Sequence, residues 1–304
     1  MKKKLKIVLH FRHFPVAMGR FFHWALKDLG HQIFTVGSYL PGGKIPWGDQ
    51  FAFPKYDWPP NLELPAQERY PLEEVLKKVP FKPDLIIQAA DVEWLEGKAP
   101  CPNVILATDP HCIDYHPRLE NADYFFCMQK CYMADYDFPK SFWLPYAYLP
   151  TIHKFLDLGP PLWDVVFIGL QYPKRTETLQ RIADKGWLVF NGLGYIYKDY
   201  VTIYNQGWIA FNWSSQNDLP ARFWEGLAMK RVVLTNRVPD LAEFDFEEGV
   251  DYLAFSDQDE AVVKADYYLR RPELLLKIAE NGYKKVKKHT YQARCKEMLK
   301  KIYG

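Results

Sequence analysis

Short runs of residues that are apolar throughout, rather than alternating with polar ones, recur along this 304-residue chain. In the first half they occupy residues 85–87, 104–106 and 124–126, each after a short polar or proline-containing entry. Strands of this kind are typical of a parallel sheet that is covered by helices on both faces. An apolar run at 6–10, helical spacing over 21–29 and a further run at 33–36 predict a β-α-β beginning. The first half is therefore predicted to be a doubly wound α/β domain.

A second α/β domain is predicted after a loss of periodicity between residues 145 and 161. Gly159-Pro160-Pro161 closes this stretch, and the apolar run at 164–169 begins a new strand. The same rhythm continues with predicted strands near 187–190, 209–212, 232–235 and 252–255, and with predicted helices over 176–185 and 222–229. We expect two Rossmann-like domains, 1–158 and 159–304, and leave open that the last helix packs back on the N-terminal domain.

Composition excludes several classes of protein. The formal net charge of +2 gives no reason to invoke nucleic acid or an anionic membrane. Residues 1–11 hold too few apolar residues for a signal-peptide core or a membrane span. The cysteines form an odd set without Cys-x-x-Cys pairs, which argues against a disulfide framework or a cysteine zinc site: Cys101, Cys112, Cys127, Cys131 and Cys295. We expect a cytoplasmic protein without a transmembrane segment.

Ligands of doubly wound sheets bind beyond the carboxyl ends of the strands, so the loops after His10, Thr108 and Gly169 are the first places to look. Gly169 would let a ligand approach the backbone, and Lys174 and Arg175 lie just before a predicted helix start. Two cations at a helix N-terminus favour a diphosphate. The alternative is a plain strand-to-helix turn with two exposed cations.

Several segments of the second half carry a family resemblance. Arg222-Phe223-Trp224-Glu225 opens a predicted helix that precedes a buried strand, and this segment resembles the donor-binding signature of GT-B glycosyltransferases, particularly the branch of the spore maturation protein CgeB. Segments 143–147, 164–169, 204–212 and 289–294 resemble other motifs of that branch, in the expected order. The resemblance covers most of residues 142–300. In residues 1–141 it rests on the opening strand with Gly19, the Gly30-His31 turn and the strand entry at 82–84.

The resemblance implies a role for each matching residue. Glu225 matches the carboxylate that holds the ribose hydroxyls of the donor, and an acceptor-only group suits two hydroxyl donors. Arg175 matches the cation that neutralises the diphosphate, with Lys174 and Arg222 as further candidates beside Gly169. The chain departs from the wider pattern at Asn217, where a second glutamate is expected, and at Leu170, where a second arginine is expected. Asn217 is kept among the donor-binding candidates because an amide also hydrogen-bonds a sugar hydroxyl.

The first domain offers candidates on the side of the cleft where the resemblance implies the acceptor. Asp109 and His111 follow a predicted strand, and either is a candidate general base. With Asp114 and His116 they also suggest a metal site, but the resemblance implies an enzyme that neutralises its leaving group without a bound ion. We therefore assign no metal and no cofactor. The loop after the first strand supplies three acceptor-side candidates: Arg12, His13 and Gly19.

Taken together, the resemblance implies a GT-B glycosyltransferase that uses a nucleoside-diphosphate sugar, with UDP favoured, and that retains the anomeric configuration. Two alternatives stay open: a nucleotide-sugar epimerase, and a non-catalytic nucleotide- or sugar-binding module. The acceptor cannot be read from the sequence. A polysaccharide, a protein, a lipid-linked glycan, a small molecule and a modified nucleobase are all compatible.

Overall fold

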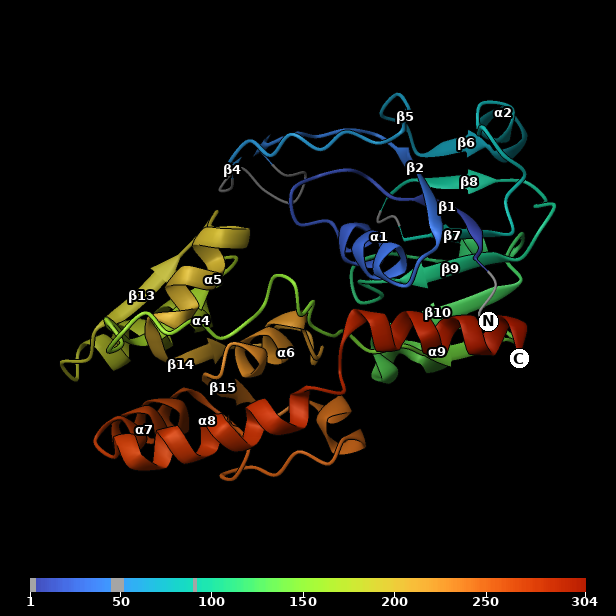
Figure 1. Ribbon diagram of the computed structural model, residues 1–304. Coiled ribbons are helices and arrows are strands. Elements are labelled where there is room, and N and C mark those ends of the chain that lie inside the picture. Colours follow the sequence, from blue (N-terminus) through green and yellow to red (C-terminus); the bar gives the residue numbers. More distant parts are fainter. Residues whose placement is uncertain (1–3, 45–51, 90–91) are drawn as a thin grey trace. The chain divides into compact units, whose positions relative to one another are not determined.

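The computed structural model describes residues 4–44, 52–89 and 92–304, and they form two compact units (Figure 1). The first unit comprises Met1–Gly43, Lys55–Pro145 and Tyr291–Gly304. The second comprises Lys44–Pro54 and Tyr146–Thr290. Residues 39–65 are rich in Pro, Gly and Trp and lack clear periodicity, which predicts a long excursion over the surface. Part of this stretch, residues 45–51, lies outside the described residues.

The first unit is built on a parallel sheet, as the uniformly apolar runs predict. Among the described residues its strand order is β11-β10-β9-β7-β1-β2-β5. The strands are β1 (Lys6–His10), β2 (Gln32–Gly37), β5 (Leu62–Glu63), β7 (Leu85–Gln88), β9 (Asn103–Ala107), β10 (Tyr124–Cys127) and β11 (Ser141–Trp143). The edge strands β5 and β11 were not predicted, because runs of two or three residues carry no periodicity.

Helices cover this sheet as a doubly wound fold requires. Helices α1 (Met18–Asp28) and α9 (Tyr291–Tyr303) pack against each other, with Tyr291 in ring contact with Phe21 and Phe22. On the other side lie α2 (Leu72–Leu76) and the small parallel pair β6 (Arg69–Pro71) and β8 (Trp94–Glu96) (Figure 1). The remaining elements are β3 (Gly43–Lys44), β4 (Ala52–Phe53), α3 (His116–Leu119) and the 3₁₀ helix η1 (Lys130–Asp135).

The second unit holds a parallel sheet of order β13-β12-β14-β15-β16. Its strands are β12 (Trp163–Ile168), β13 (Val189–Gly192), β14 (Gly207–Asn212), β15 (Val232–Asn236) and β16 (Leu253–Phe255). Its helices are α4 (Pro173–Ala183), α5 (Tyr197–Asn205), α6 (Ala221–Ala228), the 3₁₀ helix η2 (Pro239–Glu243), α7 (Gln258–Leu269) and α8 (Pro272–Val286).

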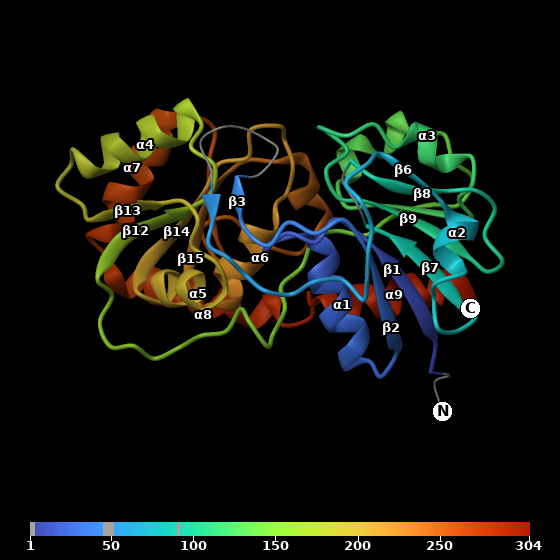
Figure 2. The same ribbon diagram turned by 90° about the horizontal axis from the view of Figure 1, so that it is seen from above.

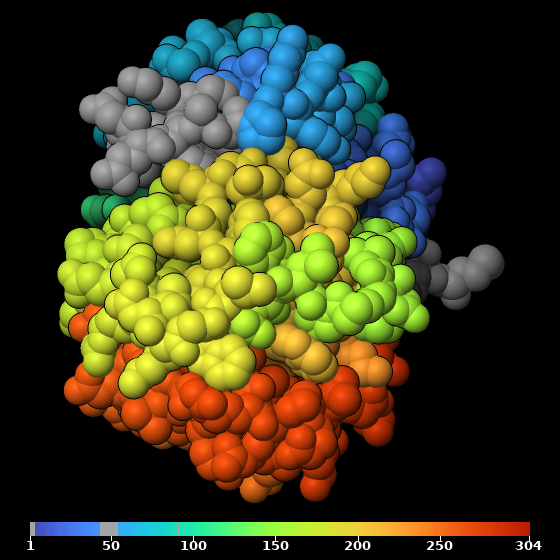
Figure 3. Space-filling view, turned by 90° about the vertical axis from the view of Figure 1, so that its left-hand side faces the viewer, coloured from blue at the N-terminus to red at the C-terminus, as the bar shows by residue number. Residues whose placement is uncertain are grey.

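The two faces of the second sheet carry different helices (Figure 2). Phe167 and Phe211 lie in one core with residues of α4, α7 and α8. On the opposite face α6 approaches so closely that a Cβ at Gly226 would lie 2.8 Å from Val233. Helices α4 and α7–α8 occupy neighbouring areas of the surface in Figure 3. The fold class expected from the sequence, two doubly wound α/β sheets, is confirmed.

The division between the units falls at Pro145 and Tyr146, whereas the sequence pattern places the boundary at 158 and 159. The intervening segment lacks regular structure, but side chains hold it to the second unit. Asn205 accepts a hydrogen bond from the Leu156 amide and donates to the Lys154 carbonyl. Helix α9 groups with the first unit. None of the described helices is both long and apolar enough to cross a membrane.

Candidate functional site

Three of the predicted donor residues, Gly169, Arg175 and Arg222, meet at the carboxyl end of β12. The strand ends at Ile168, and Gly169 continues the ladder by donating its amide to the Gly192 carbonyl. Proline then sets the start of two helices, because Pro173 opens α4 and Pro220 precedes α6. Neither helix has a side-chain cap at its N-terminus. Each therefore presents uncapped backbone amides to this end of the second sheet.

Two arginines extend from these helices to the strand end. Arg175 donates from Nε to the Trp213 carbonyl at 2.7 Å and from Nη1 to the Leu170 carbonyl at 2.9 Å. Arg222 donates from Nε to the Ile168 carbonyl at 3.2 Å and from Nη1 to Asn212 Oδ1 at 2.8 Å. Both guanidinium groups lie over the Phe167 ring, at 5.4 and 4.8 Å from its centroid. Each guanidinium is therefore held through Nε and Nη1.

No ion pair neutralises the charge of these two arginines within the described residues, and the carboxylate of Asp218 attracts Arg175 only from beyond ion-pair distance. Neither Arg175 nor Arg222 forms an ion pair with a carboxylate there, and Nη2 of each makes no hydrogen bond. Burial, together with the neighbouring charge of Arg222, lowers the pKa of Arg175 to about 10. Two partly desolvated cations without a counter-ion are a favourable environment for an anion.

The Arg222 side chain passes so close to residue 169 that it leaves no room for a Cβ atom there. A Cβ atom at this position would lie 2.5 Å from Arg222 Nη2 and 3.1 Å from the Phe167 ring. The absence of a side chain therefore keeps both the backbone and the free guanidinium nitrogen accessible at the strand end. The sequence expectation that a ligand can approach the backbone here stays a prediction, with Arg222 as the specific reason for glycine.

Glu225 lies on α6, one turn after Arg222, and is buried. Its Oε2 accepts a hydrogen bond of 2.6 Å from the Tyr200 hydroxyl, and its Oε1 lies 3.3 Å from His153 Nε2. Burial and the charge of Glu225 raise the pKa of Tyr200, so that the phenol stays a donor. Burial lowers the pKa of His153, although Glu225 opposes this shift. A carboxylate offers about four acceptor positions, so these two contacts leave room for further donors.

Tyr200 and His153 were not identified from the sequence. Tyr200 belongs to α5, a helix that the apolar pattern did not reveal, because its few buried positions do not form a long stripe. His153 lies in the irregular segment before the predicted boundary. The available signal was the spacing of Tyr200 and Tyr204, which places two phenols on one helix face. Tyr204 accepts a hydrogen bond from the Ile168 amide at the end of β12.

The remaining donor candidates of the second unit are Lys174 and Asn217. Lys174 is exposed in the first turn of α4. Asn217 lies in the loop between β14 and α6 and has a positive φ of 58°. Asparagine tolerates this left-handed conformation better than glutamate does, which gives a backbone reason for the departure from the wider pattern.

The structure separates the four residues that suggested a metal site in the first unit. Asp114 and His116 pair at the surface, with 2.7 Å between Oδ1 and Nδ1, and His116 also contacts the Asp135 carbonyl. Asp109 and His111 are partly buried, and Asp109 accepts a hydrogen bond from the Thr108 hydroxyl. In residues 4–44, 52–89 and 92–304, no three His, Cys, Asp or Glu side chains are grouped so that they could hold a metal ion.

The three acceptor-side candidates of the first unit are buried or close-packed. His13 is fully buried and stacks on Phe11 with 3.8 Å between ring centroids. Burial, assisted by the charge of Arg20, lowers the pKa of His13 to about 2, so the ring is neutral. Gly19 lies against the same ring, because a Cβ there would be 2.2 Å from Phe11. Arg12 is buried as well.

A buried polar cluster at the end of β1 was also missed. Glu93 accepts hydrogen bonds from the Ser38 amide and hydroxyl and from the Tyr70 hydroxyl, and its Oε1 lies 3.5 Å from His10 Nε2. Burial by itself raises the pKa of Glu93, but His10 and Ser38 outweigh it and hold the pKa below its usual value. Its partners lie far apart in sequence, so no local pattern connects them.

Comparisons with known proteins agree with the fold. Residues 157–300 match the protein family described as glycosyl transferase-like. No curated protein matches the sequence. Among solved structures, the chain is similar to a glycosyltransferase from Rickettsia africae, with a TM-score of 0.65, 13% identity and coverage of 98% of this chain and 97% of that one.

Two further solved structures have the same architecture. Sucrose-phosphate synthase from Thermosynechococcus elongatus gives a TM-score of 0.60 at 13% identity, with 98% of each chain covered. HepE from Anabaena, solved in complex with UDP-glucose, gives a TM-score of 0.61 at 12% identity, with 97% of this chain and 99% of that one covered. At these identities the likeness concerns the fold, which is GT-B.

Proposed function

We propose that this glycosyltransferase takes its sugar from a uridine diphosphate donor, binds that donor at the carboxyl end of β12, and transfers the sugar with retention of the anomeric configuration. We also place the chain in the CgeB-like branch, on the motifs at 204–212, 222–229 and 289–294. The acceptor is left open.

The pair of arginines without a counter-ion carries the proposal. Arg175 and Arg222 meet at Gly169, each held through Nε and Nη1, with no carboxylate paired to either among the described residues. A diphosphate would supply the missing negative charge and accept from both free Nη2 groups. The uncapped N-termini of α4 and α6 add amide donors on the same side.

The same groups serve the chemistry. When the glycosidic bond breaks, negative charge grows on the phosphate oxygen that leaves. Cations fixed before the reaction stabilise this charge without reorganising, and in many enzymes such electrostatic stabilisation contributes more to the rate than any other effect. Arg175, Arg222 and the exposed Lys174 can meet the charge without a bound ion, so we propose that transfer needs no metal and no cofactor.

Glu225 is proposed to hold the donor ribose. Its carboxylate is already fixed by Tyr200 and faces His153, so the two remaining acceptor positions are oriented before a ligand arrives. A ribose presents two adjacent hydroxyl donors, which suit one carboxylate. Asn217 is a candidate contact for the sugar, while Asp109 or His111 is the candidate base for the acceptor hydroxyl.

UDP is favoured over other nucleotides by the comparison with HepE, which was solved with UDP-glucose and with UDP and glucose. The proposal is tested by incubating the chain with a panel of UDP and GDP sugars and measuring release of the nucleoside diphosphate, since slow transfer to water reports on donor binding without a known acceptor.

We expect release of UDP that persists in excess EDTA, and an NMR spectrum of the first-formed sugar with the anomeric configuration of the donor. Release that stops in EDTA and returns with manganese would contradict metal independence. An inverted product would contradict retention, and release from no donor of the panel would remove the donor assignment.

A further inference from the structure

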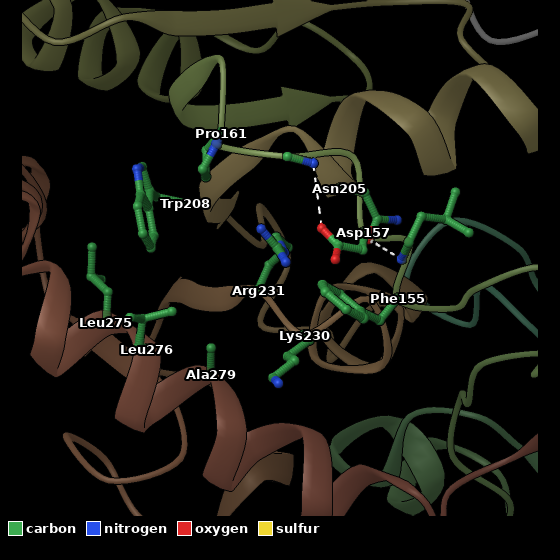
Figure 4. A pocket seen from close by; sticks show the side chains of 12 residues that line it. Phe155, Asp157, Pro161, Asn205, Trp208, Lys230, Arg231, Leu275, Leu276 and Ala279 are labelled. Carbon is green, nitrogen blue, oxygen red and sulfur yellow. Dashed lines mark hydrogen bonds between the residues drawn. The ribbon is translucent and has the colours of Figure 1, made fainter.

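A pocket of about 180 Å³ lies in the second unit, away from the residues assigned to the donor (Figure 4). Three of its lining residues mark its place in the fold: Trp208 is near the start of β14, Arg231 directly precedes β15, and Pro161 precedes β12. These are the amino ends of parallel strands, whereas Gly169 and Asn212 lie at the carboxyl ends. The pocket and the donor residues therefore lie at opposite ends of the strands of one sheet.

Arg231 lies in the middle of the lining, between Trp208 and Phe155 in Figure 4. It donates from Nη1 to the Gly207 carbonyl at 2.7 Å and from Nε to the Met229 carbonyl at 3.0 Å. No carboxylate of the described residues forms an ion pair with it, and its Nη2 has no hydrogen-bond partner there. Burial lowers the pKa of Arg231 to about 10. A rigidly held cation thus faces the pocket without a counter-ion.

The lining holds two other charged side chains, Lys230 and Asp157. Lys230 pairs with Glu280, with 2.7 Å between Nζ and Oε2. Asp157 is exposed and accepts a hydrogen bond from the Gly159 amide at 3.4 Å. Asp157 keeps its negative charge, which water screens because the side chain is exposed. The charge of the half-buried Arg231 is screened less, so its Nη2 is the position at which a ligand carboxylate can accept a charge-assisted hydrogen bond.

Most of the remaining lining is apolar. The Trp208 side chain is on one side and Phe155 is on the other, with Leu275, Leu276 and Ala279 of α8 along the floor (Figure 4). Phe155 is 40% exposed and Leu276 is 56% exposed, so apolar surface remains to be covered. Asn205 fixes the wall that carries Phe155 through its bonds to Leu156 and Lys154.

We infer that this pocket is a second ligand site, which binds a small molecule with one carboxylate attached to an apolar ring. The carboxylate accepts from Arg231 Nη2, and the ring lies beside Trp208 over Leu276. This inference does not depend on the donor assignment, because the two sets of residues share no member.

Benzoate is the probe that matches this chemistry, and two relatives separate its parts. Benzamide keeps the ring and shape without the charge, and acetate keeps the charge without the ring. By calorimetry or ligand-observed NMR on the full chain, we expect benzoate to bind at about millimolar concentration, as its few atoms allow. Benzamide and acetate should bind at least about tenfold more weakly.

Saturating UDP should leave benzoate binding unchanged, because the two sites lie at opposite ends of the strands. Equal binding of benzoate and benzamide, competition by UDP, or no benzoate binding at tens of millimolar would each overturn the proposal. If UDP itself fails to bind, the donor assignment is lost, but the comparison of the three probes still tests the second ligand site.

Two variants test whether benzoate binds in this pocket. Arg231→Gln removes the charge and keeps a donor for the Gly207 carbonyl, while Leu276→Glu puts a carboxylate on the exposed floor. Each should weaken benzoate binding at least about tenfold. Leu188→Glu is the matched control, because Leu188 is 59% exposed in the same unit and does not line the pocket. Unchanged binding in folded Leu276→Glu, or equal loss in Leu188→Glu, would contradict the assignment.

Discussion

The first strand of each sheet ends in a cluster of charged side chains, and the two clusters are organised in opposite ways. At the end of β1, the buried Glu93 is surrounded by Ser38, Tyr70 and His10, so its charge is satisfied within the unit. At the end of β12, the guanidinium groups of Arg175 and Arg222 donate hydrogen bonds to carbonyl and amide oxygens. Neither forms an ion pair with a carboxylate among the described residues.

We interpret this difference as one between a structural cluster and the proposed binding site. A buried charge that already has internal partners gains little from a ligand, and removal of one of those partners destabilises the fold. Two neighbouring cations without an ion pair gain a partner only when an anion arrives. Side chains at the β12 end should therefore control donor use, and side chains at the β1 end should control the stability of the first unit.

Removal of Arg175 should have the largest effect. Arg175→Ala deletes a cation that faces charge developing on the leaving phosphate, so kcat should fall roughly 10²–10³-fold, as when one preorganised oxyanion donor is removed. The measurement is donor turnover at saturating and limiting UDP-sugar. Arg181→Ala is the matched control, since Arg181 is on the same helix but pairs with Asp259 at the surface. Equal turnover in the two variants would remove Arg175 from the site.

Glu225→Gln should act on binding instead. It removes the charge from a carboxylate that is proposed to hold the ribose before and during the reaction. Donor binding should weaken by about 1.5–3 kcal/mol, mostly through KM. Tyr200→Phe provides a control for positioning, because it removes only the hydrogen bond to Glu225 and should give a smaller rise in KM. A normal KM in folded Glu225→Gln would place the ribose elsewhere.

At the β1 end, acid should act on stability through His13. Its folded pKa of about 2 lies below the ordinary value of 6.5, so the unfolded chain binds the proton more readily between these values. The contribution of the neutral ring to the free energy of unfolding is fully present above pH 6.5. It decreases as pH falls, by about 2 kcal/mol between pH 6.5 and 5. His23, whose pKa burial lowers to about 4, adds a change of the same sign.

The His13→Phe variant should therefore lose less stability than the wild type between pH 6.5 and 5, measured by urea unfolding at each pH. His116→Gln is the control, because its exposed ring pairs with Asp114, which raises the pKa of His116. An identical pH dependence in wild type and His13→Phe would show that His13 is not the group that titrates.

Gly169→Ala should have the smallest effect and should separate packing from charge. The new Cβ would displace Arg222 Nη2, the end of a flexible side chain, rather than the fold. We expect UDP affinity to fall about 3–10-fold, part of a charge-assisted hydrogen bond, with little change in Tm. Calorimetry and thermal unfolding measure the two. A large loss of Tm with unchanged UDP affinity would reverse the interpretation.

The sequence revealed the parts of this molecule that depend on local pattern. Uniformly apolar runs predicted the strands β1, β7, β9, β10, β12, β14 and β15, because strands buried on both faces have no polar side to interrupt the run. Helix α5 and the edge strands β5 and β11 stayed hidden, since their few residues form no long apolar stripe or run. The division between units was likewise displaced by the contacts of Asn205.

The candidate site shows the same limit. The resemblance selected Arg175, Arg222 and Glu225, but it did not reveal that Tyr200 and His153 hold Glu225 or that Arg222 crosses Gly169. Those contacts join elements whose order in the sheet cannot be read from the chain. The Glu93 cluster was missed for the same reason, as its members come from four separate segments.

The most direct test of the central claim is a calorimetric comparison of UDP with uridine, which lacks the diphosphate. In the wild type, UDP should bind at least about a hundredfold more tightly than uridine, because two charge-assisted contacts contribute about 1.5–3 kcal/mol each before desolvation is subtracted. In the double variant Arg175→Gln and Arg222→Gln, this preference should nearly vanish while weak uridine binding remains. A preference for UDP that is unchanged in the folded double variant would contradict the claim that the two unpaired arginines at the end of β12 bind the diphosphate.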